Sequence, residues 1–362
     1  MPDLYIGLMS GTSLDGIDAV LADLDSGKAR IAGHLHRPFA ADLRAELLAL
    51  NRSGSDELRR SALAANELAR AYAASVRALL ENHPEVGAVI AIGCHGQTVR
   101  HQPAEGYTMQ LVNGALLAEL TGIDVVCDFR SRDIAAGGQG APLVPAFHHA
   151  VFASRDVHRV IVNIGGIANF TSLPPDGTIT GFDCGPGNVL LDAWTQRHLN
   201  QPFDRDGVWA RSGRVIPELL ARLLADEYFR RLSPKSTGRE TFNLDWLTRQ
   251  LAGSEKPADV QATLLALTVQ GIADATTKFC PGVREVYLCG GGARNAAFVE
   301  LLSQPPAPRQ IAVTDTLGID AEHVEALAFA WLARQALNRQ TSNLPAVTGA
   351  RGARILGALY RA

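Results

Sequence analysis

The sequence predicts a protein of two domains, each with an α/β or α+β fold built on a central mixed sheet. Its 362 residues exceed what one typical hydrophobic core organises, so two packed domains are expected. Long helical stretches follow antiparallel strand starts, and glycine-rich turns stand at strand ends. Both halves of the chain also open with three short strands, which indicates that each domain contains a sheet with the same strand arrangement.

The first half begins with an antiparallel meander and continues into helices. Apolar residues 4–9 and 17–24 flank the turn-rich Ser10–Gly16, which is typical of a β-hairpin, and a third strand follows. Residues 41–82 change to helical periodicity with a break at 51–55. The other elements expected here are strands at 86–92 and 123–127 and a helix at 111–120.

The opening pattern recurs in the second half. Strands are expected at 160–164, 168–173 and 178–182, with Gly165–Gly166 at the first turn. This predicts a duplication of architecture, not of residue identity. The other elements expected are helices at 189–200, 214–232, 258–280, 294–303, 322–338 and 351–361 and a strand at 285–289.

A domain boundary is expected at residues 130–145, where helix formers give way to glycine and proline. The last helix could cross back to the first domain. We therefore assign residues 1–135 with 345–362 to one domain and 136–344 to the other.

Composition excludes several classes of protein. The net charge of −3 argues against nucleic acid or an anionic membrane surface as a partner. The five cysteines are widely spread and form no C-x-x-C pair, which favours free thiols in a reducing compartment. No segment approaches the ~18 uninterrupted apolar residues that a membrane span needs. These features predict a cytoplasmic protein without a membrane segment.

The most informative motif is the run from Gly11 to Asp18. Its glycines let backbone N–H groups converge on an anion, and hydroxyl groups add donors. The carboxylates of Asp15 and Asp18 could hold Mg²⁺, directly or through water. A hairpin with a capped turn would explain the run equally well. The predicted binding residues are Gly11, Thr12, Ser13, Leu14, Asp15, Gly16, Ile17 and Asp18.

Two further glycine turns could approach a nucleotide. The turn Gly165–Gly166 with Asn169 could present amides to a phosphate, although a purely structural hairpin is the simpler reading. The triplet Gly290, Gly291 and Gly292 follows a buried strand, and Asn295 stands where a Rossmann motif needs its last glycine. A platform for adenosine fits this spacing better, and a plain strand–helix turn competes with it.

Asp183 is the candidate general base. It is expected at the end of a strand, ahead of two glycines, where open α/β sheets bind ligands. An aspartate there could accept a proton from an attacking hydroxyl or water. The alternative is a cap for the helix near residue 189, for which Asn188 is better placed.

Polar residues elsewhere could hold a substrate. His95, Gln97 and Arg130 follow predicted strands, and an arginine can bind a carboxylate through two hydrogen bonds. Each is also compatible with a structural or solvated position. Glu325 lies in an apolar helix, where a carboxylate needs a partner or a ligand unless that position is exposed.

The order of these motifs resembles the anhydro-N-acetylmuramic acid kinases. The similarity runs from Met9–Asp18 through residues 93–98, 128–145, 163–170, 182–188 and 290–295 to Val324–Ala333. The opening S-G-T-S-x-D-G-x-D run is specific to that family. Many relatives in the wider hexokinase–actin–heat-shock chaperone superfamily carry aspartate where this chain has Met9. Asp15, Asp18 or Asp183 would then hold Mg²⁺ instead, or the ATP phosphates would hold most of it.

The resemblance implies a two-lobed actin/hexokinase-like fold with a ribonuclease H-like sheet in each lobe and an active site between the lobes. It implies a homodimer that uses ATP and Mg²⁺ to open 1,6-anhydro-N-acetylmuramic acid with water and to phosphorylate O6. Asp183 would activate the water, and Arg130 and Glu325 would hold the sugar. Two alternatives stay open: an ordinary sugar kinase that opens no ring, and a non-catalytic ATP-dependent clamp.

Overall fold

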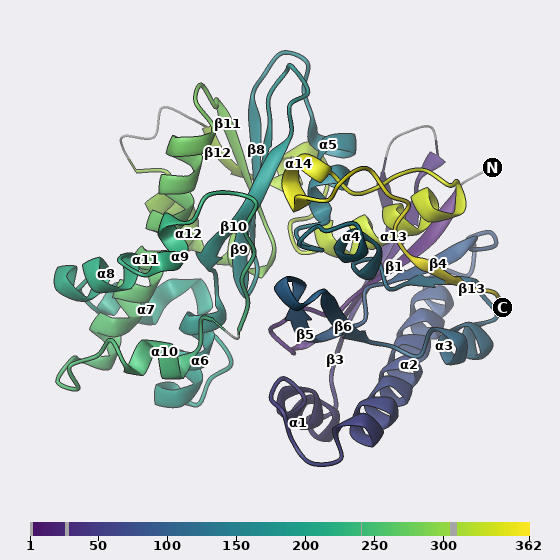
Figure 1. The fold of residues 1–362 in the computed structure, drawn as a ribbon, viewed down its shortest axis with the longest axis horizontal. Helices are drawn as coiled ribbons and strands as arrows, with labels where there is room; N and C mark the ends of the chain where they lie inside the picture. Colours follow the sequence, from purple (N-terminus) through teal and green to yellow (C-terminus); the bar gives the residue numbers. More distant parts are fainter. Residues whose placement is uncertain (1–2, 26–28, 240, 305–309) are drawn as a thin grey trace. The chain divides into compact units, whose positions relative to one another are not determined.

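The computed structural model describes residues 3–25, 29–239, 241–304 and 310–362 (Figure 1). The chain forms two compact units, Met1–Val151 with His323–Ala362 and Phe152–Glu322. Residues 136–151 and 323–344, which we expected in the second domain, therefore lie in the first unit. The helix α13 (Val324–Leu337) forms most of the second of these segments, and it packs on the first sheet.

The first unit contains a mixed sheet with the strand order β13-β7-β4-β1-β2-β3. Strands β1, β2 and β3 form the expected antiparallel meander, and β4 and β7 continue the sheet in parallel. A small separate sheet pairs β5 with β6. The strands are β1 (Leu4–Met9), β2 (Gly16–Asp23), β3 (Arg30–Pro38), β4 (Ala91–Cys94), β5 (Gln97–Gln102), β6 (Tyr107–Leu111), β7 (Val125–Cys127) and β13 (Ala358–Tyr360).

Helices cover both faces of this sheet. Leu4, Ile6 and Leu8 share one hydrophobic core with the long helix α2. Because side chains alternate along a strand, Gly7 points to the opposite face, where it meets α13. The helices of this unit besides α13 are α1 (Ala41–Ala49), α2 (Glu57–Glu81), α3 (Gly114–Thr121), α4 (Ser131–Ala135), α5 (Val144–Phe152) and α14 (Pro345–Thr348).

The contact of α13 with the sheet requires two glycines. Gly7 and Gly93 lie opposite each other in register on β1 and β4. A Cβ atom on Gly7 would lie 1.8 Å from the carbonyl oxygen of Ala326, and one on Gly93 would lie 2.0 Å from that of Phe329. The helix backbone therefore approaches the strands at a distance that only glycine permits.

The second unit repeats the strand order of the first. Its sheet has the order β10-β9-β8-β11-β12, an antiparallel meander continued by two parallel strands. The predicted α/β class and the predicted duplication of architecture are thus confirmed. The strands are β8 (Arg159–Ile164), β9 (Ile167–Leu173), β10 (Thr180–Pro186), β11 (Glu285–Cys289) and β12 (Gln310–Val313).

One face of the second sheet packs on the helix α11 (Pro257–Phe279). The rings of Phe170 and Phe182 lie 4.6 Å apart, and Phe279 lies 4.8 Å from Phe182. Since side chains alternate, their neighbours Asn169 and Asp183 point to the other face. The remaining helices are α6 (Val189–Leu199), α7 (Val208–Ser212), α8 (Pro217–Leu224), α9 (Glu227–Arg230), α10 (Leu244–Thr248) and α12 (Ala296–Leu302).

The C-terminal segment returns to the first unit, as expected, but the helix predicted at 351–361 is wrong. Strand β13 pairs with β7 instead, and the yellow end of the chain lies beside the first sheet in Figure 1. Gly357 has a φ of +97°, and a Cβ atom there would lie 2.5 Å from Val126. The buried carboxylate of Asp133 anchors the same segment by accepting hydrogen bonds from Asn343 and Thr348.

Other elements also differ from prediction. The strand expected at 86–92 is shifted, because β4 pairs with β1 only from Ala91. The expected helix 214–232 is divided into α8 and α9, and the strands β5, β6 and β12 were not predicted.

Candidate active site

The loop between β1 and β2 carries the first predicted anion site. The start of this loop is fixed by Ser10, which is buried and whose Oγ lies 2.6 Å from the hydroxyl of Tyr72. The amide of Gln97 donates to the carbonyl oxygen of Gly11 at 3.1 Å. Gln97 therefore holds the loop, a role that its sequence position did not reveal.

Only some residues of the run from Gly11 to Asp18 have side chains that can contact a ligand. Leu14 and Ile17 are buried in the hydrophobic core, so these two can offer only backbone groups. Gly16 is required by strand packing, since a Cβ atom would lie 2.4 Å from the carbonyl oxygen of Arg37. Gly11 has open space, because its nearest contact would be the side chain of Ser13 at 3.6 Å.

The acidic residues of this run have different surroundings. Asp15 is exposed, and its Oδ1 accepts hydrogen bonds from Ser13 Oγ at 2.7 Å and from the amide of Gly16. Asp18 lies on β2 and pairs with His36 Nδ1 at 2.7 Å. The carboxylates offer the oxygen ligands that Mg²⁺ prefers. Within the described ranges, no three His, Cys, Asp or Glu side chains gather into a group that could hold a metal.

His95 and Arg130 come together in the first unit. The guanidinium of Arg130 approaches His95 Nε2 with Nη2 at 2.9 Å and Nε at 3.2 Å, and its Nη1 donates to Gly140 at 2.8 Å. Burial, and secondly the charge of Arg130, lowers the pKa of His95 to about 3. His95 is therefore neutral near pH 7, with Nε2 accepting and the proton on Nδ1.

Glu325 is connected to this pair through α13. It lies half-buried in the first turn of α13, four residues before Phe329 and on the same helical face. The ring of Phe329 lies 4.7 Å from that of His95. The face of α13 that carries Glu325 therefore lies in the same region of the first unit as His95 and Arg130.

Asp183 lies in a polar row across the second sheet. Asn163 faces Asn169 in register, and Asn169 faces Asp183 on the next strand. Paired residues of neighbouring strands share a face, so the three side chains stand side by side. Among the described residues, Oδ1 of each asparagine is buried without a hydrogen-bond partner.

Asp183 is more enclosed than the sequence predicted. It lies inside β10, because pairing with β9 continues to Pro186 beyond a bulge at Cys184. Its side chain is buried, and Oδ2 accepts a hydrogen bond from the amide of Thr237 at 2.9 Å. Burial raises the pKa of the neighbouring Cys184 thiol, which keeps that thiol protonated and unreactive.

The hairpin turn Gly165–Gly166 serves the helix that follows β10. The two glycine carbonyls accept hydrogen bonds from the amides of Gly187, Asn188 and Val189. Gly187 must itself be glycine, since a Cβ atom would lie 2.2 Å from the oxygen of Gly165. The turn and the start of α6 therefore pack against each other beside the polar row.

The turn after β11 contains one glycine with free space. A Cβ atom on Gly290 would lie 2.2 Å from Asn163 Oδ1, and one on Gly292 would lie 2.3 Å from Ile164. Gly291 meets nothing within 4 Å, so a ligand could lie against it. Asn295 caps α12 through the amide of Ala297, which is a structural role.

Three residues around Asp183 were not predicted from the sequence: Tyr228, Lys235 and Thr237. Arg294, which connects the turn after β11 to three carboxylates, was not predicted either. Nη1, Nη2 and Nε of Arg294 lie 2.9, 2.6 and 3.3 Å from Asp315, Asp320 and Glu322, respectively. These residues follow no periodic pattern, so no signal in the sequence would have singled them out.

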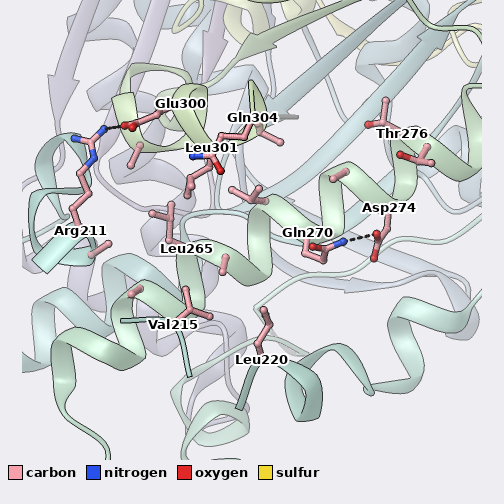
Figure 2. A pocket seen from close by; sticks show the side chains of 18 of the residues that line it. Arg211, Val215, Leu220, Leu265, Gln270, Asp274, Thr276, Glu300, Leu301 and Gln304 are labelled. Carbon is pink, nitrogen blue, oxygen red and sulfur yellow. Dashed lines mark hydrogen bonds and ion pairs between the residues drawn. The ribbon is translucent and has the colours of Figure 1, made fainter. Parts of the chain in front are cut away.

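The second unit also has a pocket away from these residues. It has a volume of about 850 Å³ and lies along α11, between α8 and α12. Figure 2 shows the pair Arg211–Glu300 at one side and the pair Gln270–Asp274 on α11. None of the predicted site residues lines it.

No helix in the described part of the chain combines the length and apolar character needed to cross a bilayer.

The chain is similar in sequence to one family of known proteins. The family model for anhydro-N-acetylmuramic acid kinase matches residues 3–362. The anhydro-N-acetylmuramic acid kinase of Nitrosomonas europaea is 58% identical over 361 residues, and that of Nitrosospira multiformis is 55% identical over 364, each covering 99% of both chains. Among solved structures, the activator of the 2-hydroxyisocaproyl-CoA dehydratase from Clostridium difficile with bound ADPNP covers 93% of this chain and 96% of its own, with 13% identity and a TM-score of 0.46.

Proposed function

This chain belongs to the anhydro-N-acetylmuramic acid kinase family, and we propose that it uses ATP to convert 1,6-anhydro-N-acetylmuramic acid into N-acetylmuramic acid 6-phosphate. The observation that carries this proposal is identity above 50% with such kinases along 99% of the chain. The buried, hydrogen-bonded Asp183 supports it, because the reaction needs a fixed base.

In the proposed reaction, Asp183 takes a proton from a water molecule as the water oxygen bonds to C1 of the sugar. The electron pair of the breaking C1–O6 bond remains on O6. O6 then attacks the γ-phosphorus of ATP, and ADP leaves. The hydrogen bond from the Thr237 amide holds the carboxylate of Asp183 in one orientation, which favours transfer from a single water.

Arg130 and Glu325 are proposed to bind the sugar, together with His95 and Gln97. The guanidinium of Arg130 is held by His95 and Gly140, so its planar face and remaining N–H groups have a fixed direction. A guanidinium can bind a carboxylate such as that of the lactyl ether through two hydrogen bonds. His95 is neutral because of its lowered pKa and adds no charge to this region.

The loop from Gly11 to Asp18 is proposed to bind phosphates, and the turns at Gly165–Gly166 and Gly291 are proposed to contact the nucleotide. The open side of Gly11 and of Gly291 supports close approach of a ligand. Asp15 is the better candidate for Mg²⁺, because it is exposed, whereas Asp18 pairs with His36. When bound, Mg²⁺ would neutralise charge on the phosphate oxygens.

The family resemblance also leads us to propose a homodimer, and the widely spread cysteines lead us to propose a cytoplasmic location. Light scattering of the purified protein at several concentrations would give twice the mass of the 38.6 kDa chain. A mass of one chain at all concentrations would contradict this proposal.

The decisive experiment is mass spectrometry of the product formed from ATP, Mg²⁺ and 1,6-anhydro-N-acetylmuramic acid in ¹⁸O-water. One ¹⁸O at C1 and none in the phosphate is expected from ring opening coupled to phosphorylation. A phosphosugar without ¹⁸O would indicate an ordinary sugar kinase. ATP binding without any phosphosugar would indicate a non-catalytic clamp.

A further inference from the structure

The residues 235–237 follow the free edge of β10 at the position of Asp183. Strand β10 is the outermost strand of its sheet, so its outward backbone groups need other partners. The amide of Asp183 donates to the carbonyl oxygen of Lys235 at 3.4 Å, and its own carbonyl oxygen accepts from the hydroxyl of Tyr228 at 2.6 Å. Both backbone groups of the proposed base are therefore held by one segment and one side chain.

Lys235 anchors this segment in the interior. It is 8% exposed, and its Nζ donates to the carbonyl oxygen of Tyr228 at 3.1 Å. The same Nζ lies 4.5 Å from the ring centre of Tyr228 and 5.1 Å from that of Phe182, both of which can stabilise a cation. Burial lowers the pKa of Lys235 and the carboxylate of Asp183 opposes that shift, so the charge of Lys235 and the carboxylate of Asp183 stabilise each other.

Thr237 lies two residues further along and contacts Asp183 directly. Its amide donates to Oδ2 of Asp183 at 2.9 Å. Its own hydroxyl Oγ1 is buried and has no hydrogen-bond partner among the described residues. A buried hydroxyl without a partner costs stability and therefore calls for a ligand or a functional reason.

We propose that the hydroxyl of Thr237 binds the oxygen atom that Asp183 deprotonates, and that Lys235 is a positioning residue that holds Thr237 and Asp183 in register. This inference rests on the proposed function, because it concerns the attacking water of that reaction. This arrangement would orient the attacking water. Two hydrogen bonds, one to Thr237 and one to Asp183, would fix both the position and the direction of a single water molecule.

The variants Thr237→Val and Thr237→Ser test the hydroxyl. Valine keeps the shape of the side chain and the backbone amide but removes the hydroxyl, whereas serine keeps the hydroxyl. We expect Thr237→Val to lower kcat roughly 10- to 100-fold while the KM for ATP stays within about threefold, and Thr237→Ser to retain most of kcat. Thr248→Val on the exposed side of α10 is the matched control and should leave kcat unchanged.

The variants Lys235→Met and Lys235→Arg test the positioning role. Loss of the positive charge disfavours the ionised form of Asp183, so the acidic limb of the kcat/KM profile should move to higher pH in Lys235→Met. Lys235→Arg keeps a positive charge and should leave the acidic limb of the kcat/KM profile at its wild-type pH. The other groups that act on Lys235 are Cys184, Arg231 and Lys278 of α11, and none of them changes in these variants.

The outcomes separate this inference from the proposed function. Wild-type turnover combined with full kcat in Thr237→Val would overturn the inference and leave the proposed function intact. An unshifted acidic limb in a folded Lys235→Met would overturn the positioning role. If Lys235→Met does not fold, as judged by circular dichroism, the Thr237 pair still decides. No phosphosugar from the wild-type protein would refute the proposed function itself.

Discussion

At the scale of the residue, Asp183 carries the proposed chemistry. The substitution Asp183→Asn keeps an oxygen that can accept from the Thr237 amide but removes the base. We expect turnover to fall by roughly 10²- to 10⁴-fold, while ATP and the sugar still bind. Isothermal titration with each ligand and a product assay would measure this. Loss of ATP binding in the variant would contradict the role and indicate a structural or metal-binding one.

The site could be predicted only where chemistry left a mark in local sequence. Asp183, Arg130 and the glycine turns stand out because acidic, basic and glycine residues follow buried strands. The contact between His95 and Arg130 joins residues 35 positions apart, so no local pattern encodes it. Likewise, the core positions of Leu14 and Ile17 follow from packing in three dimensions.

At the scale of the element, the contact of α13 with the first sheet limits what its strands tolerate. In Gly93→Ala the new methyl group would lie 2.0 Å from a carbonyl oxygen of α13, so the helix or the strand must move. We expect a loss of about 1–3 kcal/mol or more in the free energy of unfolding. Urea denaturation measures it. The matched control is Gly87→Ala, whose Cβ would meet only Leu4 at 4.0 Å, and an equal loss in both variants would contradict the explanation.

The elements themselves were predicted well where periodicity is long or turns are marked. The meanders at residues 4–38 and 159–186 and the helices α2 and α11 agree with their patterns. The strands β12 and β13 are short and owe their existence to pairing with a neighbour. The Arg-, Ala- and Leu-rich end of the chain has helical propensity, but pairing with β7 outweighs it.

At the scale of the whole molecule, buried histidines make stability depend on pH. His95, His101 and His148 all lie in the first unit, and burial lowers their pKa to about 3, 4 and 3, with Arg130 contributing at the first two. Unfolded histidine titrates near 6.5, so below that pH the unfolded chain binds protons that the folded chain excludes.

The free energy of unfolding should therefore fall as the pH drops from about 6.5 to 5.5, by up to about 1.4 kcal/mol per pH unit for each of these histidines. Urea denaturation at pH 7.5, 6.5 and 5.5 measures the slope. The variant His148→Gln removes one titrating group and should reduce the slope by about a third. A flat profile over this range would contradict the burial of these rings.

The order of the chain predicts that the two units differ as isolated fragments. The second unit is one continuous segment, 152–322, whereas the first combines 1–151 with 323–362. Without the second part, the first sheet loses α13 from one face and β13 from one edge, and Asp133 loses Asn343 and Thr348. A buried carboxylate without partners and an uncovered apolar face are both costly. We therefore expect fragment 1–151 to remain unfolded or to aggregate, and 1–151 joined by a Gly/Ser linker to 323–362 to give dispersed amide signals in NMR spectra. A well-folded 1–151 fragment would show that α13 and the C-terminal segment add nothing essential to this unit.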